Sequence, residues 1–365
     1  MENQDDEKYQ ALARVVKQLL GLVTGLVLLV LVLFLYILHI QPDEPVFSFF
    51  SEKKKPTTES SATVKNVPVT LISNSEYWSA PEIASLQSHP DKEKIIYGKD
   101  LISQTALYFG PNGKLKKNAT NGMNCQNCHL DAGTRVFGNN YGSVFSTYPR
   151  YRARSGGLED IYKRVNDCLE RSLNGQPLDT ASKEMQAIKA YIYWLGKDVP
   201  KGKKAEGSGL KDIPLLDRPA DPEKGKTAYL VHCEKCHMTN GQGQMNPEFT
   251  AYTYPPLWGE NSYNDGAGLY RISNFAKYIR FNMPLGATHM NPTLTDEEAW
   301  DIAAFVNSQP RPKKNLSKDW PKIAEKPFDH PYGPYADGFD EKQHKYGPFR
   351  PIKEAAAAAA VSSKQ

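Results

Sequence analysis

The chain has 365 residues and a formal net charge of +4 at pH 7. This length allows about two domains. The small excess of positive charge does not support a nucleic-acid-binding protein, so we expect no nucleic-acid partner. Five cysteines and a strongly apolar N-terminal segment are the features that distinguish the sequence.

Residues 18–40 form an apolar segment without a formal charge that is long enough to cross the core of a bilayer. No small-residue cleavage site follows it, which argues against a signal peptide, and a segment that is apolar on all sides fits poorly in a soluble core. Lys8, Arg14 and Lys17 precede the segment and favour a cytoplasmic N-terminus. We therefore expect a single-pass anchor in the cytoplasmic membrane, with residues 1–17 in the cytoplasm and the remaining chain on the periplasmic side.

Composition separates the rest of the chain into two periodic regions and several irregular segments. Stretches rich in Pro, Ser, Thr, Gly and Lys are typical of tethers and linkers. After the second periodic region, aromatic residues recur without helical periodicity, which predicts irregular chain that wraps over the domains. The Ala-rich end is expected to be disordered. The expected boundaries are tether 41–75, first domain 76–200, linker 201–220, second domain 221–312, irregular C-terminal extension 313–353 and disordered tail 354–365.

The two periodic regions follow the same plan. Each places a Gly-Lys pair on an opening helix, then a Cys-x-x-Cys-His motif, and then an amphipathic closing helix before a proline. The Gly-Lys pairs are Gly98-Lys99 and Gly225-Lys226. Thr295 and Glu298 form a capping box at the start of the second closing helix. Since strand signals are few, we expect a mainly α protein with two tandem helical domains.

Both domains contain the spacing at which c-type haem is attached. Two cysteines one helical turn apart can form thioethers with the two vinyl groups of one haem, and the histidine that follows can bind the iron. A zinc knuckle or a redox-active dithiol would share part of this spacing. Two copies, each inside the same helical repeat and outside the membrane, favour two covalently bound haem c groups. The motifs are Cys125-Gln-Asn-Cys128-His129 and Cys233-Glu-Lys-Cys236-His237.

Met283 is the predicted second iron ligand in the second domain. It precedes a proline between the haem motif and the closing helix, as in the distal ligand loop of class I cytochromes c, which this domain resembles. Met290 is the nearest competitor, whereas Met238 and Met245 lie too close to the haem motif. Core packing is the ordinary role of a methionine, but the loop context favours ligation. His/Met ligation raises the reduction potential of a haem and suits an electron exit.

Cys168 is the predicted second ligand in the first domain, which has no Met-Pro sequence. Helical spacing places Cys168 on one face with Leu158, Ile161, Val165 and Ser172, directed at the haem. The haem motifs use the other four cysteines, so no intrachain disulfide is available to it. A small buried hydrophobe and an intermolecular disulfide are the alternatives. The position favours a thiolate ligand to the iron.

Together, these features resemble the dihaem thiosulfate dehydrogenases, which form tetrathionate. The resemblance covers roughly residues 75–350 and rests on NCQNCH, VNDCLERSLNG, EMQAIKAYIYWL, HCEKCH, NMP and the aromatic stretch YGPYADGF. It implies two class I cytochrome c domains with His/Cys and His/Met ligation, and oxidation of two thiosulfates to one tetrathionate, with reversal chemically allowed. It further implies that electrons pass from an electron-rich, low-potential first haem through the second haem to an external acceptor, either a small cytochrome c or a membrane oxidase.

The resemblance also assigns residues to a substrate site beside the catalytic Cys168. Arg154, Arg164 and Ser172 match the substrate pocket of the family best. Guanidinium groups are natural partners for a dianion such as thiosulfate. The same stretch contains three further arginines, Arg150, Arg152 and Arg171. Of the five arginines, we expect at least half to hold haem propionates or to face solvent.

The sequence departs from the family at Asn282, where some relatives carry a lysine that can exchange with the methionine ligand, so fixed His/Met ligation is expected here. Most relatives are soluble secreted proteins, whereas this chain carries an apolar segment. The alternative function is a membrane-anchored dihaem electron-transfer cytochrome of a respiratory complex, in which Cys168 only tunes a potential. That alternative does not explain the arginines. A dihaem peroxidase would need an open iron, whereas each haem here has a candidate ligand.

Overall fold

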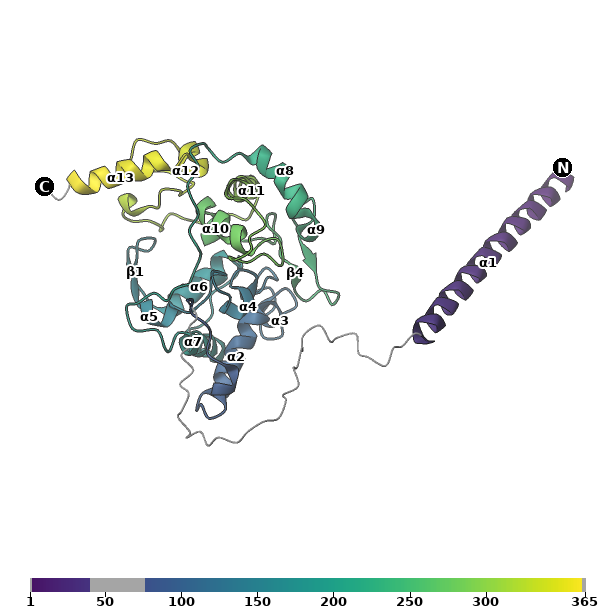
Figure 1. Cartoon of the computed structure of the whole chain (residues 1–365), viewed down its shortest axis with the longest axis horizontal. Helices are drawn as coiled ribbons and strands as arrows, with labels where there is room; N and C mark the ends of the chain where they lie inside the picture. The colour runs from purple at the N-terminus through teal and green to yellow at the C-terminus, as the bar shows by residue number, and fades with distance from the viewer. Residues whose placement is uncertain (1, 40–75, 363–365) are drawn as a thin grey trace, which may run out of the picture. The chain divides into compact units, whose positions relative to one another are not determined.

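The computed structural model describes residues 2–39 and 76–362 of the chain. The N-terminal part is a single helix, α1 (Glu2–His39) (Figure 1). Within it, Arg14–Leu35 is long and apolar enough to cross a membrane. By length and composition, this stretch qualifies as a membrane anchor or as the apolar core of a signal sequence. The predicted tether, 41–75, lies outside the described residues.

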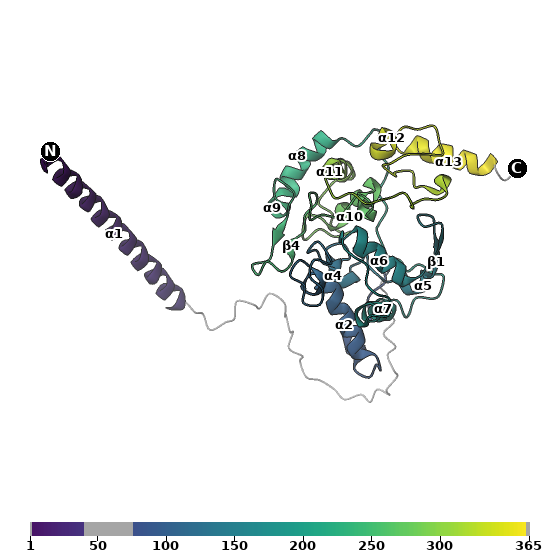
Figure 2. The ribbon, with the colours of Figure 1, turned by 180° about the vertical axis from the view of Figure 1, so that it is seen from behind.

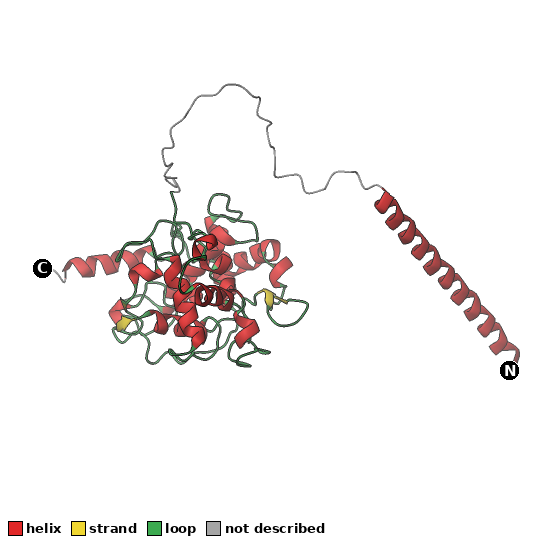
Figure 3. Ribbon diagram, turned by 90° about the horizontal axis from the view of Figure 1, so that it is seen from below, coloured by secondary structure: helices red, strands yellow, loops and turns green. Residues whose placement is uncertain are grey.

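The chain from Ile72 onward forms one compact unit in which helices predominate (Figure 3). In the described part of this unit, the strands form two short antiparallel ribbons, so the prediction of a mainly α protein is confirmed. The first lobe (76–200) contains η1 Ile83–Leu86, α2 Lys92–Ser103, α3 Thr105–Phe109, η2 Cys125–Asn127, α4 Leu130–Gly133, α5 Val144–Thr147, β1 Arg150–Arg152, β2 Gly157–Glu159, α6 Ile161–Arg171 and α7 Lys183–Leu195. The second lobe (221–312) contains α8 Pro222–His232, α9 Glu234–His237, β3 Gln244–Met245, β4 Tyr252–Tyr254, η3 Gly268–Tyr270, α10 Ile272–Asn282 and α11 Asp296–Ser308. The extension that follows contains η4 Ile323–Glu325, α12 Glu341–Tyr346 and α13 Arg350–Ser362.

Four of the longer helices, α6, α7, α8 and α11, begin where a side chain caps their first free N–H groups. Thr295 and Glu298 form the predicted capping box at the start of α11. The Ser182 hydroxyl accepts from the main-chain N–H of Met185 at the start of α7. Asp160 does the same at the start of α6, where its carboxylate accepts from the N–H of Lys163 at 2.9 Å. The cap at Asp160 fixes the first turn of the helix that carries Cys168.

In each lobe the opening helix packs against the closing helix, α2 against α7 and α8 against α11 (Figures 1 and 2), and a glycine of the opening helix lies at this contact. A Cβ on Gly98 of α2 would lie 2.0 Å from the carbonyl oxygen of Ala187 in α7. A Cβ on Gly225 of α8 would lie 1.8 Å from the carbonyl oxygen of Asp301 in α11. Any side chain would force the helices apart, so the repeated glycines set the same close crossing in both lobes.

The two lobes share one hydrophobic core. Met123, Leu169 and Leu173 of the first lobe belong to the same buried cluster as the helices of the second lobe. Ile213, in the predicted linker 201–220, is also buried in this cluster. The lobes therefore pack as parts of one body, and the chain between them contributes to the core.

The C-terminal extension packs on the second lobe as expected, but it contains more helix than expected. Phe349 is buried, and its ring centroid lies 5.5 Å from that of Trp300 in α11. The predicted irregular and disordered end is wrong from Arg350 to Ser362, where the chain forms α13. Alanine has the highest helix propensity of all residues, so the alanine run extends a helix that begins at Arg350.

Candidate functional site

The Cys-x-x-Cys-His motif of the second lobe faces a cavity of about 430 Å³. Cys233, Cys236, His237 and Met283 all line this cavity. The His237 Nδ1 atom lies 2.8 Å from the carbonyl oxygen of Pro255. Since a carbonyl only accepts, Nδ1 must donate, which fixes the tautomer and leaves Nε2 as the atom able to bind a metal.

Helix α10 positions Met283 at the cavity. The helix ends at Asn282, and the extended backbone of Met283 directly follows its last turn. The competing methionine, Met290, is 77% exposed and does not line the cavity. The geometry thus supports Met283 over Met290 as the ligand opposite His237.

The motif of the first lobe is held in the same way. The His129 Nδ1 atom donates to the carbonyl oxygen of Asn139 at 2.6 Å, and the imidazole stacks on Tyr141 with ring centroids 4.5 Å apart. The main-chain N–H of Cys125 donates to the Thr105 hydroxyl at 3.0 Å. Burial lowers the pKa of His129 to about 4, which keeps the imidazole neutral and able to act as a ligand.

Cys168 lies close to the sulfur atoms of the first motif. The pKa of Cys128 is raised to about 12, first by burial and then by the negative charges of Cys168 and Cys125. Cys168 is half-buried on α6, one turn beyond Arg164. The thiolate charge of Cys168 is the largest cause of the raised pKa of Arg164. The structure therefore brings together the motif, Cys168 and the half-buried Arg164 side chain.

Leu158 does not belong to the face of α6 on which it is predicted to lie. Leu158 lies in β2, before α6 begins, and is 74% exposed. The face that carries Cys168 starts at Ile161, which is buried. Asp160 interrupts the periodicity because it caps the helix, so the residues before it cannot follow the helical spacing.

The five arginines near Cys168 differ in their partners. Arg171 is buried and forms a bidentate ion pair with Asp319, with both N–O distances 2.8 Å. Arg152 lies 3.9 Å from Glu159, and Arg150 is exposed. Arg171 and Arg152 are thus neutralised by carboxylates within the protein.

Arg154 and Arg164 are the two arginines that remain for a ligand. Among the described residues, no carboxylate lies within 4.0 Å of the Arg164 guanidinium. Arg154 makes one long contact, with its Nε atom 4.0 Å from Asp319. Burial, followed by the charges of Arg171 and Arg164, lowers the pKa of Arg154 to about 10. The positive charges of Arg154 and Arg164 therefore act on each other, and both groups are suited to an anionic ligand.

Ser172 caps the C-terminal end of α6, and its main-chain N–H donates to the carbonyl oxygen of Cys168 at 2.8 Å. Its side chain is half-buried. This puts Ser172 one helical turn beyond Cys168, on the same side of the helix.

Sequence reasoning missed two residues of this site, Asp319 and Trp320. The Trp320 N–H donates to the carbonyl oxygen of Arg154 at 2.7 Å, and its ring lies 5.8 Å from the Arg154 guanidinium. Asp319 is 148 residues away from Arg171 in the chain, so no local pattern connects them. The extension after the second lobe therefore supports the site of the first lobe.

The two Cys-x-x-Cys-His motifs lie close together in the structure. Asn127 and Cys128 of the first motif line the cavity of the second. Tyr278, on α10, donates its hydroxyl to the carbonyl oxygen of Asn127 at 2.8 Å. Asn282 donates to the carbonyl oxygen of Phe137 in the first lobe at 3.2 Å. Groups bound at the two motifs would be close neighbours with little chain between them.

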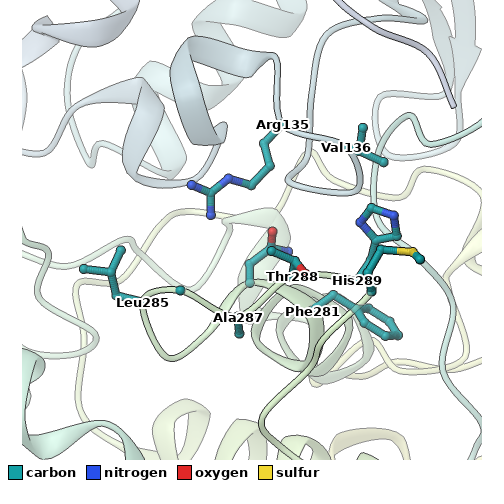
Figure 4. Close-up of a pocket in the computed structure, with 10 residues that line it drawn as sticks. Arg135, Val136, Phe281, Leu285, Ala287, Thr288 and His289 are labelled. Carbon is teal, nitrogen blue, oxygen red and sulfur yellow. The ribbon is translucent and has the colours of Figure 1, made fainter. Parts of the chain in front are cut away.

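A hollow of about 560 Å³ opens beside the loop that follows Met283 (Figure 4). Arg135 and Val136 of the first lobe lie on one side of it, and the loop residues lie on the other. Leu285 and Met290 of this loop are 73% and 77% exposed. Exposed apolar side chains beside a ligand loop offer a protein partner a contact surface.

These residues fit two haem groups. Each motif has two cysteines and a histidine whose Nδ1 is already used by a carbonyl oxygen. Each lobe also supplies one further sulfur atom as a possible iron ligand, that of Cys168 in the first lobe and that of Met283 in the second. This donor set, with a cavity at the second motif, is typical of c-type haem.

Comparisons with known proteins agree with this interpretation. The family described as SoxA/TsdA, cytochrome c domain, matches residues 115–200, and the family described as Cytochrome c matches residues 222–310. A thiosulfate dehydrogenase of Psychrobacter arcticus is 40% identical over 57% of this chain and 62% of its own length. The thiosulfate dehydrogenase of Stutzerimonas stutzeri is 34% identical over 65% of this chain and 74% of its own length. The thiosulfate dehydrogenase of Allochromatium vinosum is 35% identical over 64% of this chain and 84% of its own length.

A solved structure is also similar. The thiosulfate dehydrogenase (TsdBA) of Marichromatium purpuratum, in its as-isolated form, matches with a TM-score of 0.59 and 29% identity, over 65% of this chain and 50% of that chain. The match thus spans half of the solved chain and less than two thirds of the Psychrobacter relative. Two cytochrome c domains carry two covalently bound haem c groups, which confirms the predicted cofactors.

Proposed function

Because this chain belongs to the thiosulfate dehydrogenase family of cytochrome c oxidoreductases, we propose that it oxidises thiosulfate to tetrathionate at the first lobe. The observation that carries the proposal is the Arg164 guanidinium, which lies one helical turn before Cys168 on α6 and has no carboxylate within 4.0 Å among the described residues. Because no carboxylate of the protein is paired with it at this distance, the guanidinium is available to an anionic ligand.

The residues that hold the haem groups follow from the site. Cys125 and Cys128 attach the first haem, with His129 and Cys168 as iron ligands. The second haem is attached and ligated by Cys233, Cys236, His237 and Met283. When bound, the haem groups supply one-electron redox chemistry, which accepts electrons from sulfur and delivers them to an acceptor.

The residues around Cys168 bind and orient the substrate. Thiosulfate carries two negative charges, which match the two guanidinium groups of Arg154 and Arg164. Ser172 offers a hydroxyl to a sulfonate oxygen from the next turn of α6. With the oxygens held there, the outer sulfur of thiosulfate is directed at Cys168. A second thiosulfate then joins the first through its own outer sulfur, so that one S–S bond forms and two electrons leave.

The electrons leave through the second lobe to an external acceptor, a small cytochrome c or a membrane oxidase. The exposed loop with Leu285 and Met290 supports contact with such a partner near Met283. Helix α1 supports single-pass anchoring in the cytoplasmic membrane with a cytoplasmic N-terminus and the haem lobes on the periplasmic side. Anchoring would keep the chain close to a membrane acceptor.

Thiosulfate-dependent reduction of ferricyanide by the full haem-loaded chain tests the proposal. We expect turnover, with one tetrathionate formed for every two thiosulfates consumed. A chain whose haem groups reduce and reoxidise normally, but which does not consume thiosulfate, would instead be an electron-transfer cytochrome in which Cys168 only tunes a potential.

A further inference from the structure

A groove of about 580 Å³ runs between α6 and the start of the C-terminal extension. It shares no lining residue with the cavity at the second motif, and part of its wall belongs to a segment that neither matched cytochrome domain includes. Its cationic lining consists of Arg154, Lys163, Arg171, Lys313, Lys314 and Lys318. Four carboxylates share the lining, so positive groups are in excess.

Each carboxylate of the groove already has a basic partner. Asp319 pairs with Arg171 at 2.8 Å, and Asp167 pairs with Lys163 at 2.5 Å. Glu170 lies 3.1 Å from Lys314, and Glu159 lies 3.9 Å from Arg152. The acidic charges are thus neutralised within the wall, which leaves the excess positive charge for a ligand.

The excess charge lies at the two ends of the groove. At the rim, Lys318 is exposed with no carboxylate within 4.0 Å among the described residues, whereas Lys313, which is 75% exposed, lies 3.3 Å from Asp265. At the inner end, the Arg154 side chain is 15% exposed and lies 4.0 Å from Asp319, and Arg164 lies on α6 one helical turn before Cys168. Positive groups therefore extend from the rim toward the helix that carries Cys168.

We propose that this groove is the access site at which a sulfur-oxoanion dianion first binds before it reaches Arg154 and Cys168. The inference rests on the proposed function and adds to it the route of the substrate. A cleft lined by one sign of charge raises the local concentration of the opposite charge and speeds association, by about tenfold to a thousandfold. The reaction consumes two dianions that repel each other, so a second positive site near the first would help to bring them together.

Charge reversal at the rim tests the proposal in the full haem-loaded chain. In the double variant Lys313→Glu/Lys318→Glu, we expect kcat/KM for thiosulfate to fall about tenfold at low ionic strength. Added salt should reduce the difference in kcat/KM between the variant and the parent, because ions screen the electrostatic attraction between the groove and thiosulfate. Turnover at saturating substrate should stay unchanged. The matched control is Lys116→Glu/Lys117→Glu, which makes the same charge change at exposed lysines outside the groove lining and should leave kcat/KM within twofold of the parent.

Equilibrium binding of radiolabelled thiosulfate separates this proposal from the proposed function. Weaker binding to the Lys313/Lys318 variant than to the control supports the groove, even if the parent shows no turnover. Equal binding and equal kcat/KM in the two double variants would overturn it, whether or not thiosulfate is oxidised. Absence of turnover in the parent would count against the dehydrogenase activity alone.

Discussion

The two lobes use one scaffold for two different chemical tasks. Both cross an opening and a closing helix at a glycine, Gly98 in one and Gly225 in the other. Both orient the motif histidine through a hydrogen bond from Nδ1 to a carbonyl oxygen. They differ in what faces the haem from the opposite side. The common parts therefore hold the cofactor, and the part that differs decides what each haem can do.

The first lobe places a charged helix opposite its motif, whereas the second places a loop there. Helix α6 presents Cys168 with Arg164 one turn before it, and the extension adds Asp319 behind them. The second lobe presents Met283 at the end of α10, followed by the exposed Leu285. A buried cationic site suits an anionic substrate, and an exposed apolar loop suits a protein partner. This difference supports the proposal that catalysis occurs in the first lobe and electron exit in the second.

The largest effect is expected from Cys168→Ala. If α6 is the catalytic element, loss of the sulfur should reduce thiosulfate oxidation at least about a thousandfold, the scale seen when a reacting group is removed. Steady-state ferricyanide assays and the haem content of the purified variant provide the measurement. Full activity in a variant that retains both haem groups would remove the distinction between the lobes.

The next largest effect is expected from Arg164→Gln. Loss of the guanidinium would break the charge pair that it forms with bound thiosulfate, which costs about 2–5 kcal/mol, so kcat/KM for thiosulfate should fall about a hundredfold. Arg150→Gln, at an exposed arginine of the same segment, is the control and should change kcat/KM less than twofold. Equal losses in the two variants would show that general positive charge, and not the guanidinium beside Cys168, binds the substrate.

A smaller effect is expected from Met283→His, which changes the proposed iron ligand of the second haem, where electrons leave the protein. Replacement of a methionine ligand by histidine should lower the potential of the second haem, because Met/His ligation raises it. We expect kcat to fall about tenfold with an unchanged KM for thiosulfate. Redox titration followed by absorbance measures the potential. Met290→His is the control, because Met290 is 77% exposed, and its reduction potential should equal that of the parent. A lowered potential in Met290→His, with an unchanged potential in Met283→His, would make Met290 the ligand in place of Met283.

The smallest effects are expected from Gly98→Ala and Gly225→Ala, which should be alike. Alanine gains up to about 1 kcal/mol of helix propensity over glycine. A Cβ within 2.0 Å of a main-chain oxygen outweighs this gain, because overpacking costs about 1–3 kcal/mol or more. Thermal unfolding should show a fall in Tm of a few degrees for each variant. Gly268→Ala, where nothing lies within 4 Å of the added Cβ, should leave Tm unchanged. A large difference between Gly98→Ala and Gly225→Ala would contradict the common scaffold.

Local patterns in the sequence predicted the scaffold well. The capping box at Thr295 and the amphipathic closing helices depend on residues three or four apart, and both are present. The predicted disorder of the tail is wrong because the alanine run extends a helix that already begins at Arg350. The spacing of Leu158 fits the face of α6, but Asp160 begins that helix after Leu158.

Contacts between distant segments could not be predicted. The pairing of Arg171 with Asp319 joins residues 148 positions apart, so the sequence did not show which arginine is neutralised. The same holds for the hydrogen bond between Tyr278 and Asn127, which joins residues 151 positions apart and brings the two motifs together. Such contacts depend on the packing of whole lobes, which the periodicity of a single helix does not contain.

Rapid mixing of thiosulfate with two single variants tests most directly whether catalysis occurs in the first lobe and electron exit in the second. Haem reduction is followed by absorbance in Cys168→Ala and in Met283→His, and reduction by dithionite shows that both haem groups are present. The account predicts that Met283→His still takes up electrons from thiosulfate in a first fast phase, whereas Cys168→Ala takes up none on that timescale. Fast reduction of Cys168→Ala, or loss of the first phase in Met283→His, would contradict the assignment of catalysis to the first lobe.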